Sequence, residues 1–248
     1  MKSSEYIDSL LPFATKAAPN ELTAISEFLK RRQIKWIFHF THFSNLVSIF
    51  KNGILSRQEL DKKEVQFIPT DSSRADGLPN GTSLSMSFPN RWMLQRKIES
   101  MGNNFAVIEI SANALLNKRI VAFPSNAARR EFGRLVTSDP SKFVGAKGLS
   151  NLFLNDDVRQ RNHLKSEMPT DMQSEIMIFD SIEPHTLRGI HLPASMSTEF
   201  ISAVDELRLI ASEVGIDYPC RHSYFSDEFT TKSKFRAHDG RYWQPDWK

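Results

Sequence analysis

The sequence predicts an α+β fold, and three observations support this class. Short alternating or wholly apolar runs predict strands, at residues 37–40, 82–88, 106–110, 120–123 and 175–179. Apolar residues at helical spacing predict helices, at residues 45–51, from 91 onward and at 198–215. Residues 127–132 are expected to be helical, and residues 137–147 are expected to form a loop. Hydrophobic residues make up 40% of the 248-residue chain, which is enough for a substantial core.

The chain divides into one central domain with two additions. Residues 5–32 predict two amphipathic helices joined near Pro19 and Asn20, so residues 1–33 are expected to form an N-terminal helical extension. Residues 34–192 hold the motifs that carry chemistry, and residues 193–248 are expected to form a C-terminal helix and tail packed on the domain. Gly215 is expected to end the C-terminal helix.

The first chemical motif lies at the end of the strand at residues 37–40. This strand leads His39, Thr41 and His42 onto a loop. Ser44 is then expected to cap a helix that ends at Gly53. A loop at a helix N-terminus suits a phosphate-bearing ligand, because free backbone N–H groups and the helix dipole favour negative charge there. A metal is the alternative for this spacing, but no third histidine lies nearby and the chain has a single cysteine.

The second motif is a polar turn followed by a strand and a helix. Arg74 lies in the turn, where it is either a surface arginine or a guanidinium that faces a diphosphate. Residues 82–88 alternate small polar and apolar side chains, as a half-buried strand does. A helix then begins near Asn90, with Arg91 and Trp92 projecting from its first turn.

Glu175 is the residue at which we expect the chemistry. It opens the run Glu-Ile-Met-Ile-Phe, which predicts a short strand buried on both faces. A carboxylate on such a strand is costly to bury unless it meets a cation, a hydroxyl or a ligand. The alternative is a glutamate at a strand end that still reaches water.

Charged and aromatic residues favour a nucleic-acid partner in two segments of the chain, but the overall composition does not. The net charge is +3, yet residues 118–165 contain ten Lys/Arg and four Asp/Glu, and Arg129, Arg130 and Lys147 are the cations expected to contact phosphates. This window is equally well explained as a basic surface loop. Residues 218–248 interleave aromatic and basic side chains, which suits either stacking on a single strand or packing on the domain.

The single cysteine, Cys220, argues against a disulfide framework. No signal peptide is recognised, and no apolar run is long enough to cross a bilayer. A cytoplasmic protein is therefore expected.

Taken in chain order, these segments resemble the DarT family of nucleic-acid ADP-ribosyltransferases, from about residue 34 to about residue 192. The matching residues are His39, Thr41, His42, Asn45 and Leu46; Asp71, Arg74, Asp76 and Gly77; Ser85, Ser87, Phe88, Pro89 and Asn90; Asn126 and Ala127; and Pro169, Thr170, Gln173 and Glu175. The third group looks more like the guanine-modifying branch of the family. Arg91 and Trp92 depart from the Tyr-Lys pair of that branch, so the aromatic residue that faces the substrate is changed.

The resemblance implies an ADP-ribosyltransferase-like fold with a split central β-sheet and flanking helices. It implies a toxin-type enzyme that transfers ADP-ribose from NAD to a base, a purine, of single-stranded DNA or RNA and uses no metal. The implied partners are the nucleic acid and an antitoxin, which in some relatives is a hydrolase that removes ADP-ribose. A monomer is expected.

The resemblance also implies a role for each matched side chain. Glu175 and Arg74 are the expected catalytic residues. The residues expected to bind NAD are His39, Thr41, His42, Asn45 and Arg74. Those expected to bind nucleic acid are Arg91, Trp92 and Asn126, beside the three cations named above. Two other functions stay open, a non-catalytic nucleotide- or nucleic-acid-binding module and a protein-modifying transferase, the second because Gln173 lies two residues before Glu175.

Overall fold

The computed structural model describes residues 19–71, 78–129 and 139–193 and short segments beyond them. Those segments are residues 206, 209–210, 212–213, 221–225, 237–238 and 242–243. Arg74, Arg130 and most of the predicted helix at residues 198–215 lie outside the described residues.

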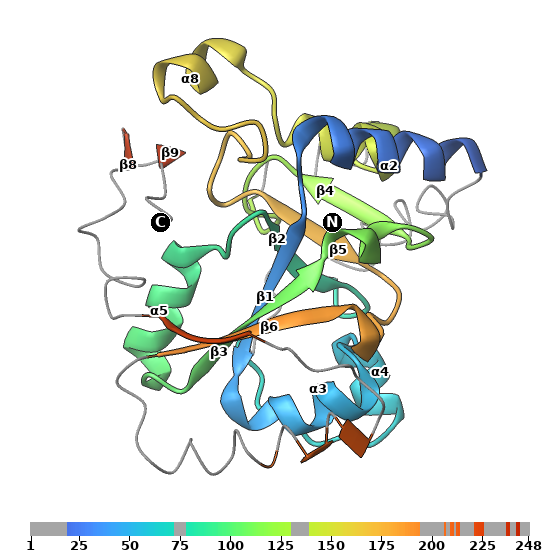
Figure 1. Cartoon of the computed structure of the whole chain (residues 1–248), viewed down its shortest axis with the longest axis vertical. Coiled ribbons are helices and arrows are strands. Elements are labelled where there is room, and N and C mark those ends of the chain that lie inside the picture. The colour runs from blue at the N-terminus through green and yellow to red at the C-terminus, as the bar shows by residue number, and fades with distance from the viewer. Residues whose placement is uncertain are drawn as a thin grey trace.

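A seven-stranded sheet, in the order β4-β5-β2-β1-β3-β6-β7, forms the centre of the molecule (Figure 1). Neighbouring strands are antiparallel except β6 and β7, which are parallel. The strands are β1 (Trp36–His42), β2 (Thr82–Met86), β3 (Phe105–Ser111), β4 (Ile120–Phe123), β5 (Glu175–Ile178), β6 (Leu187–Pro193) and β7 (Arg221–Phe225). A separate two-stranded sheet pairs β8 (Ala237–His238) with β9 (Tyr242–Trp243).

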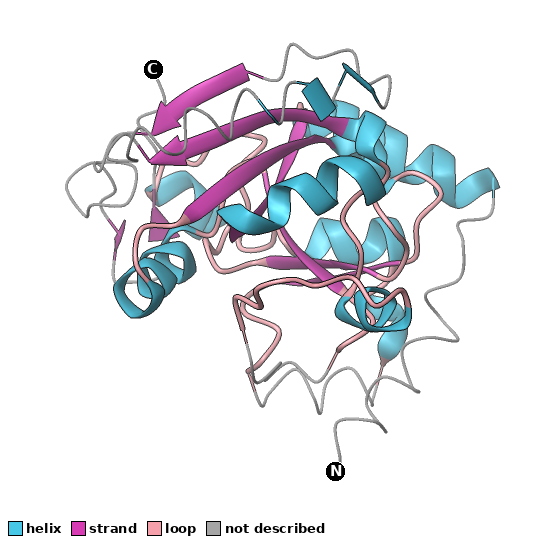
Figure 2. Cartoon of the chain, turned by 90° about the horizontal axis from the view of Figure 1, so that it is seen from below, coloured by secondary structure: helices cyan, strands magenta, loops and turns pink. Residues whose placement is uncertain are grey.

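The sheet is split at β2, as predicted. The C-terminal end of β2 pairs with β1 only at Ile37↔Met86 and Phe38↔Ser85, whereas its N-terminal end pairs with β5 from Thr82 to Leu84. β1 meanwhile continues along β3 over its whole length. β1 and β2 therefore diverge after Phe38. The β4–β5 pair runs at an angle to β1 and β3 (Figure 1), and the turned view shows strands in different directions (Figure 2).

Short helices flank both halves of the sheet. They are α2 (Pro19–Arg32), η1 (Phe43–Asn45), α3 (Leu46–Asn52), α4 (Arg57–Lys62), α5 (Arg91–Met101), η2 (Ala112–Leu115), η3 (Pro140–Lys142), α7 (Gly145–Asn151), α8 (Asp156–Arg161) and η4 (Pro184–Thr186). In Figure 1, α3 and α4 lie on one side of β1 and α5 lies on the other. Leu94 of α5 packs with Phe38, Phe105 and Val107 on one sheet face, because odd and even positions of a strand face opposite sides.

The predicted strands at residues 37–40, 82–88, 106–110, 120–123 and 175–179 are all confirmed, with bounds that move by a few residues. The predicted end of α3 is also confirmed. Gly53 has φ +77°, and a Cβ there would meet the carbonyl oxygen of Ile182 at 2.2 Å, so only glycine fits.

Three local predictions need correction. Residues 137–147 were expected to form a loop, but η3 and the start of α7 lie within them, because Gly148 packs directly on the backbone of Phe143. Ser44 is not the N-cap of α3: it lies within η1, and the ring of His42 caps η1 by accepting from the backbone N–H of Ser44. Residues 127–128 form a turn and not a helix start.

The α2 helix is built into the main core. Ile25, Phe28 and Leu29 are buried there, and the ring of Phe28 meets that of Phe153 edge-on with 5.5 Å between centroids. Apolar burial on this scale stabilises a helix that would be marginal alone. The backbone of β7 adds a strand from the C-terminal region to the edge of the sheet.

Candidate active site

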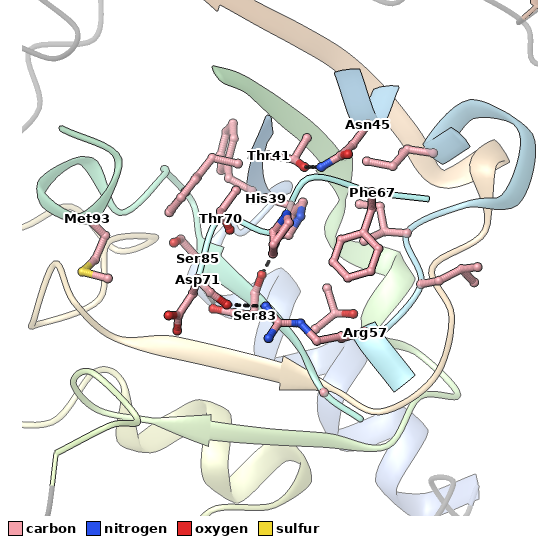
Figure 3. A pocket seen from close by; sticks show the side chains of 18 of the residues that line it. His39, Thr41, Asn45, Arg57, Phe67, Thr70, Asp71, Ser83, Ser85 and Met93 are labelled. Carbon is pink, nitrogen blue, oxygen red and sulfur yellow. Dashed lines mark hydrogen bonds between the residues drawn. The ribbon is translucent and has the colours of Figure 1, made fainter. Parts of the chain in front are cut away.

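A cleft opens where β1 and β2 diverge (Figure 3). It encloses about 1260 Å³ with its open mouth included. Its floor is formed by strand residues, among them His39, Thr41, Ser83 and Glu175, and one wall is the segment from Phe67 to Asp71. The split in the sheet thus creates the space in which the predicted chemical residues meet.

Glu175 lies in this cleft at the first position of β5, paired in register with Phe123 of β4. One carboxylate oxygen, Oε1, accepts a hydrogen bond from the hydroxyl of Ser83 on β2, and the other, Oε2, accepts from the backbone N–H of Ala127 at 3.0 Å. The side chain is partly buried. Two contacts from different segments, the Ser83 hydroxyl and the Ala127 N–H, therefore orient the carboxylate.

His39 spans the gap that opens between β1 and β2. Its Nδ1–H donates to the carbonyl oxygen of Ser83 at 2.9 Å, where a continued ladder would have placed a backbone N–H. Ser83 therefore contacts both predicted residues, His39 through its carbonyl and Glu175 through its hydroxyl. This contact fixes the ring nitrogen that carries the proton, and in a neutral ring it makes Nε2 an acceptor.

Asn45 attaches the Phe67–Asp71 wall to β1. Its amide nitrogen donates to Thr41 Oγ1 and to the carbonyl oxygen of Ile68, both at 2.9 Å, and its Oδ1 accepts from the backbone N–H of Ile68 at 2.8 Å. Thr41 and Asn45 are both buried, with 4% and 8% of their surface exposed. Asn45 thus determines where the wall lies, in addition to lining the cleft.

The segment before Glu175 is held by buried side chains. Arg159 is 7% exposed, and burial lowers its pKa from the usual value. Its guanidinium donates to the carbonyl oxygens of Met168 (2.6 Å) and Lys165 (2.9 Å). The Thr170 hydroxyl donates to the carbonyl oxygen of Leu154 at 2.6 Å. The threonine of the Pro169-Thr170 motif is therefore an anchor that leads the chain into β5.

Two predicted residues lie away from the cleft. His42 points to the opposite face of β1, where its ring meets that of Phe105, and burial lowers its pKa. Arg91 is 4% exposed, and burial lowers its pKa to about 10. It therefore does not project from the first turn of α5, whereas its neighbour Trp92 does.

Of the other residues predicted to contact nucleic acid, Asn126 lines the cleft, while Trp92, Arg129 and Lys147 are exposed at the surface. Trp92 is 41% exposed, and the guanidinium of Arg96 stacks on its ring at 4.1 Å from the centroid. The Oδ1 of Asn126 accepts from the backbone N–H of Ala128 at 2.9 Å.

The basic window at residues 118–165 is not one surface patch. Lys118 pairs with Glu183, Arg119 pairs with Asp180 at 2.9 Å, and Lys142 pairs with Asp139 at 3.1 Å. Arg159 is buried, as described above. At least four of the ten cations therefore have structural contacts, which a count along the sequence could not reveal.

Two residues of the cleft, Ser83 and Arg57, carry no functional signal of their own in the sequence. Ser83 is one polar position of an alternating strand, although that alternation does place it on the cleft side. Arg57 lines the cleft, and its Nη2 donates to the carbonyl oxygen of Asp71. No local pattern marks Arg57, because its partner lies 14 residues further along the chain.

The Ser85–Asn90 motif is largely structural. The Ser85 hydroxyl accepts from the backbone N–H of Asn90 at 3.0 Å, and the Asn90 side chain caps α5 by accepting from the N–H of Met93 at 3.1 Å. Ser87 has φ +65°, and its hydroxyl donates to the carbonyl oxygen of Glu167 at 2.6 Å. The motif therefore fixes where α5 begins beside the cleft.

Within the described residues, no group of three or more His, Cys, Asp or Glu side chains is placed to hold a metal ion. No helix in the same part of the chain is long and apolar enough to span a membrane.

A split, mainly antiparallel sheet with a glutamate oriented in the cleft is the architecture predicted above, an ADP-ribosyltransferase-like fold. Comparison with protein families agrees: residues 38–217 match the model described as "ssDNA thymidine ADP-ribosyltransferase, DarT". The chain belongs to the DarT family, and the predicted class of enzyme, an NAD-dependent ADP-ribosyltransferase, is confirmed at the level of the family. No curated protein sequence matches the chain.

Two solved structures of Thermus sp. 2.9 DarT share this fold at low sequence identity. Thermus sp. 2.9 DarT in complex with ADP-ribosylated ssDNA is 11% identical, with a TM-score of 0.55 over 80% of this chain and 97% of that one. Thermus sp. 2.9 DarT in complex with NAD+ is 14% identical, with a TM-score of 0.52 over 80% and 98%. Thermosipho africanus DarTG in complex with ADP-ribose is 16% identical, with a TM-score of 0.48, and this chain covers 79% of its own length and 51% of that protein.

Proposed function

We propose that this protein transfers ADP-ribose from NAD to a base of single-stranded nucleic acid and releases nicotinamide. The observation that carries the proposal is the position of Glu175, whose carboxylate is held in the cleft by the hydroxyl of Ser83 and the backbone N–H of Ala127. Membership of a family described as acting on ssDNA supports DNA as the acceptor, with RNA as the second candidate.

In the proposed reaction the bond between the nicotinamide nitrogen and ribose C1 breaks, and a bond from C1 to a base nitrogen forms. Positive charge develops on the ribose as nicotinamide leaves, so a fixed carboxylate near the ribose 2′-hydroxyl stabilises the transition state more than the bound substrate. Glu175 has this role. It also accepts the proton that the attacking base nitrogen loses.

The NAD side of the cleft is assigned to β1. The Nε2 of a neutral His39 accepts a hydrogen bond from a ribose hydroxyl or from the nicotinamide amide, because Nδ1 carries the proton. The Thr41 hydroxyl lies on the same strand face two residues further on. Asn45 contributes by holding the wall, and Arg74 retains its proposed role at the diphosphate or the incoming base.

The nucleic-acid side is assigned to α5 and the turn at Asn126. Trp92 and Arg96 form a stacked pair at the surface of α5, while Met93 and Lys97 of the same helix line the cleft. An exposed aromatic ring beside cations suits an unpaired base and its phosphates. Arg129 and Lys147 are proposed to contact phosphates further along the strand.

The acceptor base is proposed to be a purine, on the resemblance of Ser85–Asn90 to the guanine-modifying branch. The description of the matching family names thymidine instead. Nucleoside analysis of the product separates these two outcomes directly.

The experiment that tests the proposal compares a single-stranded oligonucleotide with its blunt duplex, each incubated with labelled NAD. We expect ADP-ribose on the single strand at a rate orders of magnitude above the duplex, because unpairing a base costs a few kcal/mol. Reversing the charge of Arg129 and Lys147 should raise the apparent KM for the oligonucleotide and leave NAD affinity unchanged. Equal rates on both substrates, or NAD hydrolysis without a nucleic-acid product, would overturn the proposal.

A toxin-type enzyme of this kind would modify the nucleic acid of its own host. We therefore propose that an antitoxin protein restrains it, directly or by removing the ADP-ribose. Coexpression supports this proposal if a neighbouring reading frame restores growth to cells that the wild-type chain arrests. The proposal fails if cells tolerate the active enzyme alone.

A further inference from the structure

The described residues that line the cleft include two basic side chains, Arg57 and Lys97. They come from different sides of β1, because Arg57 begins α4 and Lys97 belongs to α5 (Figure 1). NAD has a diphosphate with two negative charges near its centre, so a described cation in the cleft is a candidate to bind it in addition to Arg74, which lies outside the described residues. The surroundings of each cation decide between them.

A capping box fixes the N-terminus of α4, where Arg57 is the first residue. The Ser56 hydroxyl accepts from the backbone N–H of Glu59 at 3.2 Å, and the Glu59 carboxylate accepts from the backbone N–H of Ser56 at 3.1 Å. From this base the Arg57 side chain extends to the Phe67–Asp71 wall, where its Nη2 donates to the carbonyl oxygen of Asp71 (Figure 3). Its Cζ lies 6.0 Å from the centroid of the Phe67 ring.

Arg57 and Asn45 together fix the wall at its two ends. Asn45 binds the backbone N–H and the carbonyl of Ile68, and Arg57 binds the carbonyl of Asp71 three residues later. Unlike Asn45, which is buried, Arg57 is only partly buried. It therefore joins the wall to the open space of the cleft.

The neighbours of Arg57 are suited to the adenosine half of a dinucleotide. Leu55, Leu60 and Phe67 line the cleft around the start of α4 and offer apolar surface to a base. Lys97 instead shares its helix with Met93 and Trp92, the side proposed for the acceptor strand. A guanidinium also has five N–H donors in a planar fork, which matches phosphate oxygens while one N–H keeps a backbone carbonyl.

We propose that Arg57 binds the diphosphate of NAD and holds the Asp71 carbonyl at the same time, so that ligand and wall are positioned together. This inference rests on the proposed use of NAD. It adds a diphosphate-binding residue whose position is set by a contact to the wall of the cleft.

The test is isothermal titration of Arg57→Gln and Arg57→Lys with NAD, ADP-ribose and nicotinamide riboside, which lacks the diphosphate. Arg57→Gln should weaken NAD and ADP-ribose about 10- to 100-fold, as expected for a lost charge-assisted contact, and leave nicotinamide riboside nearly unchanged. Arg57→Lys keeps the positive charge without the planar fork, so its NAD affinity should lie between those of the wild type and Arg57→Gln. Lys51→Gln, an exposed change on α3, is the matched control and should bind like the wild type.

Two results would overturn the inference: NAD affinity unchanged in Arg57→Gln, or equal weakening of NAD and nicotinamide riboside, which would make Arg57 only a support for the wall. If Arg57→Gln does not fold, Arg57→Lys gives the same comparison. The inference and the proposed function fail separately. A wild type that binds NAD through Arg57 but modifies no nucleic acid contradicts only the function, whereas normal transfer with normal NAD binding in Arg57→Gln contradicts only this inference.

Discussion

The two sides of the cleft are held in different ways. Glu175 belongs to a strand that is paired on both sides, by β4 and by β2, and its carboxylate is oriented by Ser83 and Ala127. The Phe67–Asp71 wall belongs to no strand of the sheet. Two side chains from other elements, Asn45 and Arg57, attach its backbone.

This difference separates chemistry from ligand binding. The side proposed to be catalytic is set by a backbone ladder, which pairs β5 with β2 and β4. The wall is set by polar side chains that also line the cleft, so its position and the binding of the ligand depend on the same groups. Changes on the first side should alter turnover, and changes on the second should alter affinity.

The largest effect is expected for Glu175→Gln, which removes the charge and keeps the shape. Transfer should fall by about 10²- to 10⁴-fold, because the carboxylate acts on the transition state and as a base, while NAD affinity should change little. Initial rates under NAD saturation measure the loss of transfer, and calorimetry measures NAD affinity. Near-normal transfer would show that another group carries the reaction.

Next comes Ser83→Ala, which removes the hydroxyl that orients Glu175. We expect kcat to fall by about tenfold or more, the range for a lost hydrogen bond to a charged group, with a smaller change in the KM for NAD. Ser83→Thr keeps a hydroxyl and should recover part of kcat, and a merely structural role would not give this recovery. If Ser83→Ala and Ser83→Thr both lower kcat in proportion to their loss of folding stability, Ser83 only supports the strand.

A smaller effect on turnover, and a clear one on affinity, is expected for Asn45→Ala. The change leaves Thr41 and the backbone of Ile68 without their contacts, so the free energy of unfolding should fall by about 1–3 kcal/mol. NAD affinity should weaken by about tenfold because the wall is released. Urea titration and calorimetry measure these effects, and Asn52→Ala, at the exposed end of α3, is the control.

The smallest expected effect is at the surface of α5. Trp92→Ala should raise the KM for a single-stranded oligonucleotide by about fivefold, equal to about 1 kcal/mol of stacking, without changing NAD affinity. Trp92→Phe should retain most of the affinity. If Arg96→Gln and Trp92→Ala both leave the KM unchanged, the stacked pair has no part in binding the acceptor.

The same contrast explains how much the sequence could predict. The strands and the position of Glu175 could be predicted from local patterns. Alternating residues predicted β1 and β2, an apolar run predicted β5, and Gly53 predicted the end of α3. The split sheet followed from a resemblance of motifs and not from any local pattern. The cleft lies at this split because β2 pairs with β5 at its N-terminal end and with β1 at its C-terminal end.

What could not be predicted depends on contacts between distant residues. Arg57 gave no signal, because its partner is a backbone carbonyl in a loop. Arg91 and Trp92 are neighbours with opposite placement, one buried and one exposed, and the sequence assigned both to the surface. The cations Lys118 and Arg119 were counted toward a basic patch, although Glu183 and Asp180 pair with them from more than 60 residues away.

The most direct test is mass spectrometry of nucleosides after wild type and Glu175→Gln react with NAD and pools of single-stranded DNA and RNA. We expect one deoxynucleoside that gains the mass of ADP-ribose with the wild type and no such product with the variant. Modification by both proteins, or by neither while the wild type consumes NAD, would contradict the claim that Glu175 transfers ADP-ribose to nucleic acid.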